Sequence, residues 1–238
     1  MYSAGPMTVV LVHGAWHSPS HWNGLIPQLA LPTVAVDLPS CASGRADANM
    51  HADAAAIRRV LDEHKQVTLV AHSYGGIPAT EAAAGHPAVR SLVYVAAFNA
   101  DFGETLGGFE PADPAVPNVR PATDCEPAPG GLVAFRPDRA TDVFYHDCPD
   151  PDDAIRRMRP MAPAVIGQAP SAVAWKDIPS AYVICTRDRA TAVSTQRRLA
   201  TRAQRTFEVG TGHSPFLADP GQLARIITEV AVPVSAAE

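Results

Sequence analysis

The sequence predicts an α/β fold: a doubly wound, mostly parallel sheet of about six strands that carries one inserted segment. Six short runs of apolar, β-branched residues alternate with helical patterns along the chain. Most of these runs lack strict polar alternation, so we expect helices to cover both faces of the sheet. The expected strands are residues 8–13, 33–37, 67–72, 91–96, 181–185 and 206–209.

Helical patterns fill the intervals between these strands. Ile57 and Leu61 lie four residues apart, as on the apolar face of an amphipathic helix. Near the C-terminus, Asp219 is suited to cap a helix, and Pro220 is suited to its first helical position. The expected helices are residues 50–64, 77–84, 194–204 and 219–230.

The alternation breaks between residues 99 and 178, a stretch rich in Pro, Gly, Asp and Ala. A disordered linker of this length inside a compact domain would be unusual, and embedded apolar side chains indicate a folded insertion. Because the stretch follows the strand at 91–96, we expect it over the carboxyl edge of the sheet, where ligands bind in such folds. We therefore expect a core of residues 1–98 and 179–238, with residues 99–178 as a cap.

Composition narrows the classes of function. The chain has 238 residues, of which 47% are hydrophobic and 18% charged, and its formal net charge is −5. No basic stripe is present, which argues against nucleic acid as a partner. No apolar run approaches the roughly 20 residues that span a bilayer, and the N-terminus lacks the features of a signal peptide. We expect a cytoplasmic protein with no membrane partner.

The four cysteines do not form a metal-binding pattern. They are widely spaced, with no C-x-x-C and no Cys/His ligand spacing, so we expect no metal site. Free thiols are the default in a cytoplasmic chain, and pairing of Cys125 with Cys148 stays open. No G-x-G-x-x-G follows the first strand and no phosphate loop is present, so we expect no cofactor.

Ser73 is the candidate nucleophile. Residues 69–76 read Leu-Val-Ala-His-Ser-Tyr-Gly-Gly, between an expected strand and an expected helix. A serine on a sharp strand-to-helix turn projects its hydroxyl into a cleft, and the turn needs small neighbours because the two backbones approach closely. This is the G-x-S-x-G pattern of a nucleophile elbow, with Ala71 in place of the first glycine. An ordinary serine in a glycine-rich turn is the alternative.

A serine hydroxyl needs a base, and His213 is the best placed of nine histidines. It follows the last expected strand in the segment Val-Gly-Thr-Gly-His. Asp188 follows the strand at 181–185, where it could orient the imidazole. Asp177 lies at the wrong end of that strand. An ion pair with the arginines on either side of Asp188 is the alternative, and it does not exclude the catalytic role.

Two backbone N–H groups are expected to form an oxyanion hole. One belongs to Tyr74, the residue after the nucleophile, and the other to Ala15, in the loop after the first strand. Gly14 would let that loop turn inward. We also expect an apolar pocket lined by Gly14, Trp16, Phe98 and Trp175, although simple core packing is an alternative for each aromatic residue.

Other histidines near these segments have simpler explanations. His72 is expected to end its strand with its side chain directed away from the nucleophile, so it is a poor second base. His17, His21 and Trp22 cluster near the first loop. For these three we favour packing at the start of a helix over contact with substrate.

Three segments together resemble a known family. Leu-Val-His-Gly-Ala-Trp at 11–16, Ala-His-Ser-Tyr-Gly-Gly at 71–76 and Val-Ile-Cys-Thr-Arg-Asp at 183–188 resemble the methylesterase and hydroxynitrile-lyase branch of the α/β-hydrolases, and small bacterial esterases. The resemblance covers nearly the whole chain and is weakest across 110–175. It implies the α/β-hydrolase fold, a triad and an oxyanion hole, and it leaves a homodimer open because dimers are common among relatives. The implied residues are Ser73, Asp188 and His213, with Ala15 and Tyr74.

Two positions favour ester hydrolysis within that branch. The lyases carry threonine after the first-strand histidine and lysine after the catalytic histidine, whereas this chain has Gly14 and Ser214. We therefore expect a serine hydrolase that cleaves a small, largely apolar carboxylic ester or lactone through an acyl-enzyme. A cyclase, thioesterase or lyase with the same triad, or a non-catalytic small-molecule receptor, stays open because fold alone does not settle function.

Overall fold

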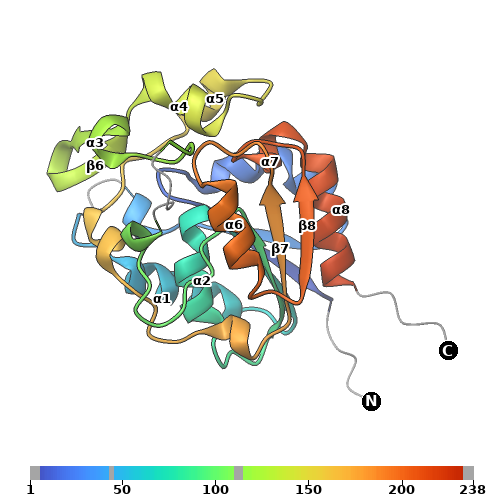
Figure 1. Cartoon of the computed structure of the whole chain (residues 1–238). Coiled ribbons are helices and arrows are strands. Elements are labelled where there is room, and N and C mark those ends of the chain that lie inside the picture. The colour runs from blue at the N-terminus through green and yellow to red at the C-terminus, as the bar shows by residue number, and fades with distance from the viewer. Residues whose placement is uncertain (1–5, 43–45, 110–114, 233–238) are drawn as a thin grey trace, which may run out of the picture.

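The computed structural model describes residues 6–42, 46–109 and 115–232, and its main element is a six-stranded sheet (Figure 1). The strands are β1 (Thr8–Val12), β2 (Thr33–Val36), β3 (Val67–His72), β4 (Val89–Val95), β7 (Ser180–Cys185) and β8 (Arg205–Val209). Their order is β2-β1-β3-β4-β7-β8, and every neighbouring pair is parallel. The predicted mostly parallel sheet is confirmed.

The main helices follow the expected strand–helix alternation, and side-chain caps begin two of them. Asn49 accepts a hydrogen bond from the Ala52 N–H at 2.9 Å, and Asp219 accepts one from the Gln222 N–H at 2.9 Å. The α-helices of the core are α1 (Met50–Asp62), α2 (Gly76–Ala83), α6 (Val193–Ala200), α7 (Pro215–Ala218) and α8 (Pro220–Ala231). The predicted cap at Asp219 is confirmed.

Short 3-10 helices occupy many of the connections. They are η1 (Pro19–Gly24), η2 (Ile26–Gln28), η3 (Pro39–Cys41), η4 (Ser73–Gly75), η5 (Leu106–Gly108), η6 (Pro129–Gly131), η7 (Pro163–Gly167) and η8 (Ala174–Lys176). One of them, η4, opens directly at Ser73 and joins β3 to α2, so the candidate nucleophile lies at the turn between a strand and a helix.

Alternate residues of the central strands β1, β3, β4 and β7 enter two separate cores. Val10 and Leu69 pack on one face of the sheet with α1, α2 and α6. Val9 and Val70 pack on the other face with α8, together with Trp22 from η1. Because both faces are buried, the strands carry apolar side chains on both sides, as in a parallel sheet between helix layers.

The chain reverses its direction across the sheet between β1 and β3. It runs outward from β1 to β2, then returns to form β3 on the other side of β1. Val12 pairs with Ala71, so the loop after β1 and the turn after β3 begin side by side. Such a switch point leaves a crevice at the carboxyl edge of the sheet, where ligands bind in open α/β folds.

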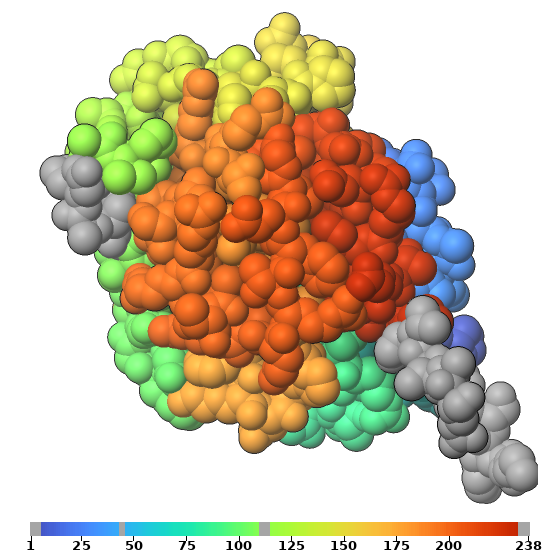
Figure 2. Space-filling view, turned by 45° about the vertical axis from the view of Figure 1, so that its right-hand side comes forward, coloured from blue at the N-terminus to red at the C-terminus, as the bar shows by residue number. Residues whose placement is uncertain are grey.

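The segment between β4 and β7 folds into short elements. Figure 1 shows α4 and α5 at the top of the molecule, on the side toward which β7 and β8 point, with α3 and β6 farther to the left. Figure 2 shows the same segment along the upper edge of the molecule. By contrast, η8 packs against α2 in the core. The cap bounds of 99–178 stay a prediction. The elements are α3 (Pro121–Asp124), β5 (Cys125–Ala128), β6 (Leu132–Phe135), α4 (Pro137–Phe144) and α5 (Pro151–Arg156).

Two further properties concern the described part of the chain. None of its helices combines the length and the apolar character needed to cross a membrane. All four cysteines are free, so Cys125 and Cys148 are not joined to each other.

Candidate active site

Ser73 stands on a strained turn between β3 and α2. Its φ of 53° lies in the left-handed region, which costs a residue other than glycine roughly 1–3 kcal/mol. The chain segments that follow β1 and β4 pack against this turn and leave no space for side chains on the residues after Tyr74. A Cβ added to Gly75 would overlap the carbonyl oxygen of His13, and one added to Gly76 would lie 2.8 Å from the carbonyl oxygen of Phe98. The sequence therefore needs both glycines to form this turn.

His213 and Asp188 lie together at the ends of neighbouring strands. The Nδ1–H of His213 donates to Oδ2 of Asp188 at 2.8 Å, and both side chains are buried. Since Nδ1 carries the proton in this bond, Nε2 of the neutral ring is left as an acceptor. This is the tautomer that a general base for a serine hydroxyl requires.

The Asp188 carboxylate is held by hydrogen bonds from α6 and from its own loop. Oδ1 accepts from the N–H groups of Ala190 and Thr191 at 2.7 and 2.9 Å. Oδ2 accepts from Nε2 of Gln196 at 2.8 Å, in addition to His213. These donors compensate the burial of the carboxylate and fix its orientation.

The arginines that flank Asp188 in sequence have other partners. Arg187 pairs with Asp147 at 3.2 Å, and Arg189 pairs with Asp142. The ion-pair alternative for Asp188 is therefore not what the structure contains, and its carboxylate is directed to His213.

His72 lies behind His213. Its Nε2–H donates to the carbonyl oxygen of His213 at 2.9 Å, and the two rings are 4.5 Å apart between centroids. Burial, reinforced by nearby His213, lowers the pKa of His72 well below its ordinary value. A neutral His72 thus supports the backbone of His213.

Tyr74 is anchored by a buried acid. Its hydroxyl donates to Oδ2 of Asp53 at 2.6 Å, and Ser40 donates to the same carboxylate from its N–H at 2.8 Å and its hydroxyl at 2.5 Å. Burial raises the pKa of Asp53 above its ordinary value. These bonds tie the residue after Ser73 to α1.

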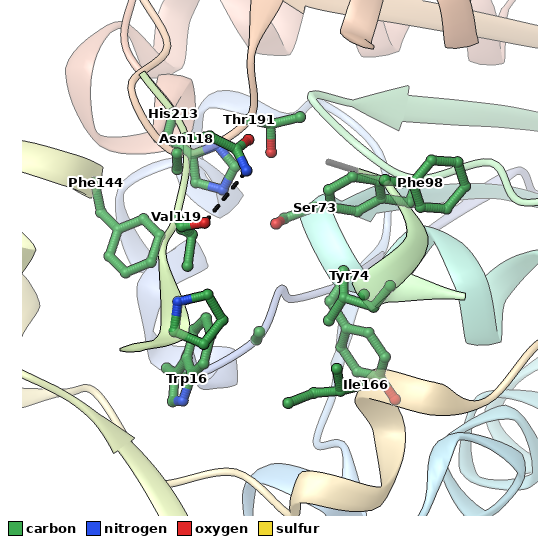
Figure 3. A pocket seen from close by; sticks show the side chains of 16 residues that line it. Trp16, Ser73, Tyr74, Phe98, Asn118, Val119, Phe144, Ile166, Thr191 and His213 are labelled. Carbon is green, nitrogen blue, oxygen red and sulfur yellow. Dashed lines mark hydrogen bonds between the residues drawn. The ribbon is translucent and has the colours of Figure 1, made fainter. Parts of the chain in front are cut away.

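Ser73 and His213 line the same cavity, whose walls are mainly apolar (Figure 3). In that view the Ser73 hydroxyl points into the open space, with Trp16 and Phe144 on one side and Phe98 on the other. The cavity volume is about 100 Å³. Besides Ser73 and His213, the lining comprises Ala15, Trp16, Tyr74, Phe98, Leu106, Gly107, Phe109, Asn118, Val119, Pro121, Phe144, Ile166, Ala190 and Thr191.

Two of the expected pocket residues lie elsewhere. Trp175 is not part of the lining; its indole N–H donates to the carbonyl oxygen of Ala100 at 3.1 Å, and the guanidinium of Arg202 lies 5.3 Å from its ring. An apolar residue within an insertion does not reveal from its sequence which surface it covers, and here Trp175 packs beside Ala100 and Arg202. Gly14 also lies outside the lining, directly beneath the Ser73 turn.

The sequence reasoning missed several residues of the cavity wall, among them Asn118, Phe144, Ile166 and Thr191. The first three come from the inserted segment, where no periodic pattern indicates orientation. Thr191 lies three residues after Asp188 and its hydroxyl points toward the cavity (Figure 3). Its proximity to the candidate acid was the one signal that could have identified it.

The cavity brings together groups that acyl transfer requires. Among the described residues, no group of three or more His, Cys, Asp or Glu side chains could hold a metal ion. A serine hydroxyl and an imidazole that is hydrogen-bonded to a buried carboxylate lie at one edge of the sheet.

Comparisons with known proteins identify the family. A model of the alpha/beta hydrolase family matches residues 9–226. The chain belongs to this family. It is also 30% identical to the alpha/beta hydrolase nvfD of Aspergillus novofumigatus (strain IBT 16806), over 94% of this chain and 96% of that protein. The membership expected from the sequence is thereby confirmed.

Solved structures share the fold of this α/β hydrolase at low sequence identity. A pyrethroid hydrolase from Sphingobium faniae JZ-2 has a TM-score of 0.80 at 22% identity, over 94% of this chain and 97% of that chain. The methylesterase MES16 from Arabidopsis has a TM-score of 0.74 at 21% identity, over 94% and 98%. Polyneuridine aldehyde esterase has a TM-score of 0.78 at 19% identity, over 96% and 100%.

Proposed function

We propose that this α/β hydrolase cleaves small, largely apolar carboxylic esters or lactones. Ser73 is the nucleophile, His213 the general base and Asp188 the residue that orients it. The observation that carries the proposal is the 2.8 Å bond from His213 Nδ1–H to buried Asp188, with His213 and the strained Ser73 lining one cavity.

Acylation follows from this arrangement. Nε2 of His213 removes the hydroxyl proton as Ser73 Oγ attacks the carbonyl carbon, and the N–H groups of Ala15 and Tyr74 stabilise the oxyanion. Asp188 stabilises the resulting imidazolium of His213. The imidazolium then protonates the leaving alcohol, and the C–O bond breaks to give the acyl-enzyme.

Deacylation repeats the sequence with water as the nucleophile. His213 removes a proton from the water, the second tetrahedral intermediate collapses, and the proton returns to Ser73 Oγ. For a lactone substrate, the alcohol released in the first half remains attached to the acyl group and leaves with it.

The walls of the cavity support an apolar substrate. Trp16, Phe98, Phe109 and Phe144 supply large apolar surfaces, whereas Asn118 and Thr191 are the polar side chains besides Ser73, Tyr74 and His213. Two of the proteins that share the fold are named as esterases, which supports an ester as the scissile bond. The cytoplasmic location and a homodimer stay predictions from the sequence.

A panel of p-nitrophenyl esters and aryl lactones tests this function. We expect Ser73-dependent turnover, with Ser73→Ala lowering kcat by roughly 10³-fold or more. Ser194→Ala, at an exposed serine on α6, serves as the matched control and should leave the rate unchanged. Turnover that survives in Ser73→Ala would contradict the covalent mechanism. Tight binding of esters without turnover would favour a receptor instead.

A further inference from the structure

Contacts from the inserted segment hold the loop after β1 in a disfavoured backbone conformation. We refer to this loop, residues 14–17, as the oxyanion loop. Trp16 has a φ of 58°, in the left-handed region that favours glycine. Its indole N–H donates to the carbonyl oxygen of Val133 at 3.1 Å, and its own carbonyl oxygen accepts from the N–H of Arg159 at 2.9 Å. Both partners belong to the segment between β4 and β7.

His17 holds Ala15 from two sides. The backbone N–H of His17 donates at 3.3 Å to the carbonyl oxygen of Gly14, which belongs to the same peptide group as the Ala15 N–H. The ring Nδ1–H of His17 donates at 2.7 Å to the carbonyl oxygen of Ala15 itself. Both peptide groups that flank Ala15 are therefore tied to His17, which restricts the direction of the Ala15 N–H.

Tyr145, just after α4, orients the ring of His17. Its hydroxyl lies 3.0 Å from Nε2 of His17 and 3.3 Å from Nε2 of His21. Because Nε2 of His21 also donates to the carbonyl oxygen of Ala154 at 3.1 Å, the tyrosine hydroxyl accepts from His21 and donates to His17. All three side chains are buried.

The protonation of His17 agrees with this arrangement. Burial, together with nearby His21 and His72, lowers the pKa of His17 well below its ordinary value. The neutral ring has one donor and one acceptor. Nδ1–H uses the donor on Ala15, and Nε2 uses the acceptor on Tyr145.

We propose that His17 and Tyr145 are positioning residues that direct the Ala15 N–H toward the oxyanion, so that the inserted segment helps to assemble the oxyanion hole. This inference rests on the proposed function, because Ala15 has this role only if Ser73 attacks a substrate. It assigns His17 more than the helix-start packing expected from the sequence. A misdirected N–H loses more in the transition state than in the ground state, so kcat should fall while KM changes little.

The test compares two buried tyrosine hydroxyls. Tyr145→Phe removes the partner of His17, whereas Tyr94→Phe removes a hydroxyl that is bonded to Thr80 at 2.7 Å, away from the oxyanion loop. We expect Tyr145→Phe to lower kcat for a p-nitrophenyl ester, and the rate at which a fluorophosphonate modifies Ser73, by about tenfold with KM within about twofold. Tyr94→Phe should leave kcat, KM and the rate of modification within about twofold of wild type.

A second pair of variants keeps the test independent of folding defects at Tyr145. The amide N–H of His17→Asn can replace Nδ1–H, so it should retain more of kcat than His17→Leu, which has no donor. Equal losses in Tyr145→Phe and Tyr94→Phe, an effect on KM alone, or equal rates in the two His17 variants would overturn the inference. A wild-type protein that neither turns over esters nor reacts with the fluorophosphonate would instead show that the proposed function has failed.

Discussion

Gly14 lies against Ser73 so closely that a Cβ added to Gly14 would stand 2.9 Å from the Cβ of Ser73 and 3.0 Å from Nδ1 of His72. The loop after β1 and the turn after β3 thus approach each other without space for a single methyl group. This contact brings a candidate oxyanion donor, Ala15, beside the candidate nucleophile.

Gly14→Ala should consequently impair both activity and stability. The added methyl group must displace the Ser73 turn or the ring of His72, and a misplacement of the nucleophile costs a large factor in rate. We expect kcat/KM to fall by about 10-fold to 100-fold. We also expect a loss of about 1–3 kcal/mol in the free energy of unfolding. Gly167→Ala is the control, because a Cβ added at Gly167 would meet open space. It should change neither kcat/KM nor the free energy of unfolding.

Asp188→Asn should slow catalysis strongly. The carboxylate accepts four hydrogen bonds, two at each oxygen. In either orientation, the NH₂ group of asparagine would therefore face N–H donors and could not accept their hydrogen bonds. The imidazole then loses the partner that fixes its tautomer, and kcat should fall by roughly 10²–10⁴-fold. Asp177→Asn, at an exposed acid before β7, should retain wild-type kcat in the same assay. Equal rates in the two variants would contradict the role of Asp188.

Asp53→Asn tests the anchor of Tyr74. The substitution replaces one acceptor oxygen of a carboxylate that accepts from Ser40 and Tyr74. A buried donor left unsatisfied should cost about 1–3 kcal/mol in the free energy of unfolding, measured by urea denaturation. Asp62→Asn, on the exposed side of the same helix α1, should cost less than about 1 kcal/mol. If Asp53→Asn lowers the free energy of unfolding no more than this control does, the hydrogen bonds from Ser40 and Tyr74 to Asp53 contribute little to stability.

Acid should destabilise the fold through its buried histidines. Burial, together with Arg157, lowers the pKa of His21 from 6.5 to about 4. Between pH 4 and pH 6.5, His21 therefore binds a proton in the unfolded chain but not in the folded chain. The contribution of His21 is complete above pH 6.5 and is lost as the pH falls toward 4. At pH 5 the loss from His21 alone should be about 2 kcal/mol. His17 and His72 act in the same direction, and Asp53, with its raised pKa, acts in the opposite one.

Urea unfolding of the wild type and of His21→Asn at pH 7.5 and pH 5 measures this contribution. The difference in the free energy of unfolding between the two pH values should be smaller in the variant by about 2 kcal/mol. An identical pH dependence in the two proteins would show that His21 does not carry the predicted share.

The sequence predicted the sheet well because each strand carries a strong local signal. Runs such as Val67–His72 are apolar on both faces and are bounded by turn residues, so their bounds agree with the structure within two residues. Asp219 and Pro220 likewise marked the start of α8 through local capping chemistry. Both kinds of signal depend only on neighbours in the chain.

The inserted segment was predicted poorly because its structure depends on distant contacts. The hairpin of β5 and β6 and the short helices α3 to α5 contain many prolines and are too short for a periodic pattern. Val133 and Tyr145 contact the loop after β1 across more than 100 residues of chain. Ser73, Asp188 and His213, by contrast, each follow a strand, so they could be proposed as candidates from the sequence.

Covalent labelling by a serine-directed inhibitor is the sharpest test of Ser73 as the nucleophile. Purified protein would be treated with an aryl fluorophosphonate and mapped by peptide mass spectrometry, with the loss of esterase activity followed in parallel. We expect one adduct, on Ser73, in proportion to the activity lost, and no adduct in Ser73→Ala. Full inactivation with the adduct on another residue, or esterase activity that persists after Ser73 is fully modified, would contradict it.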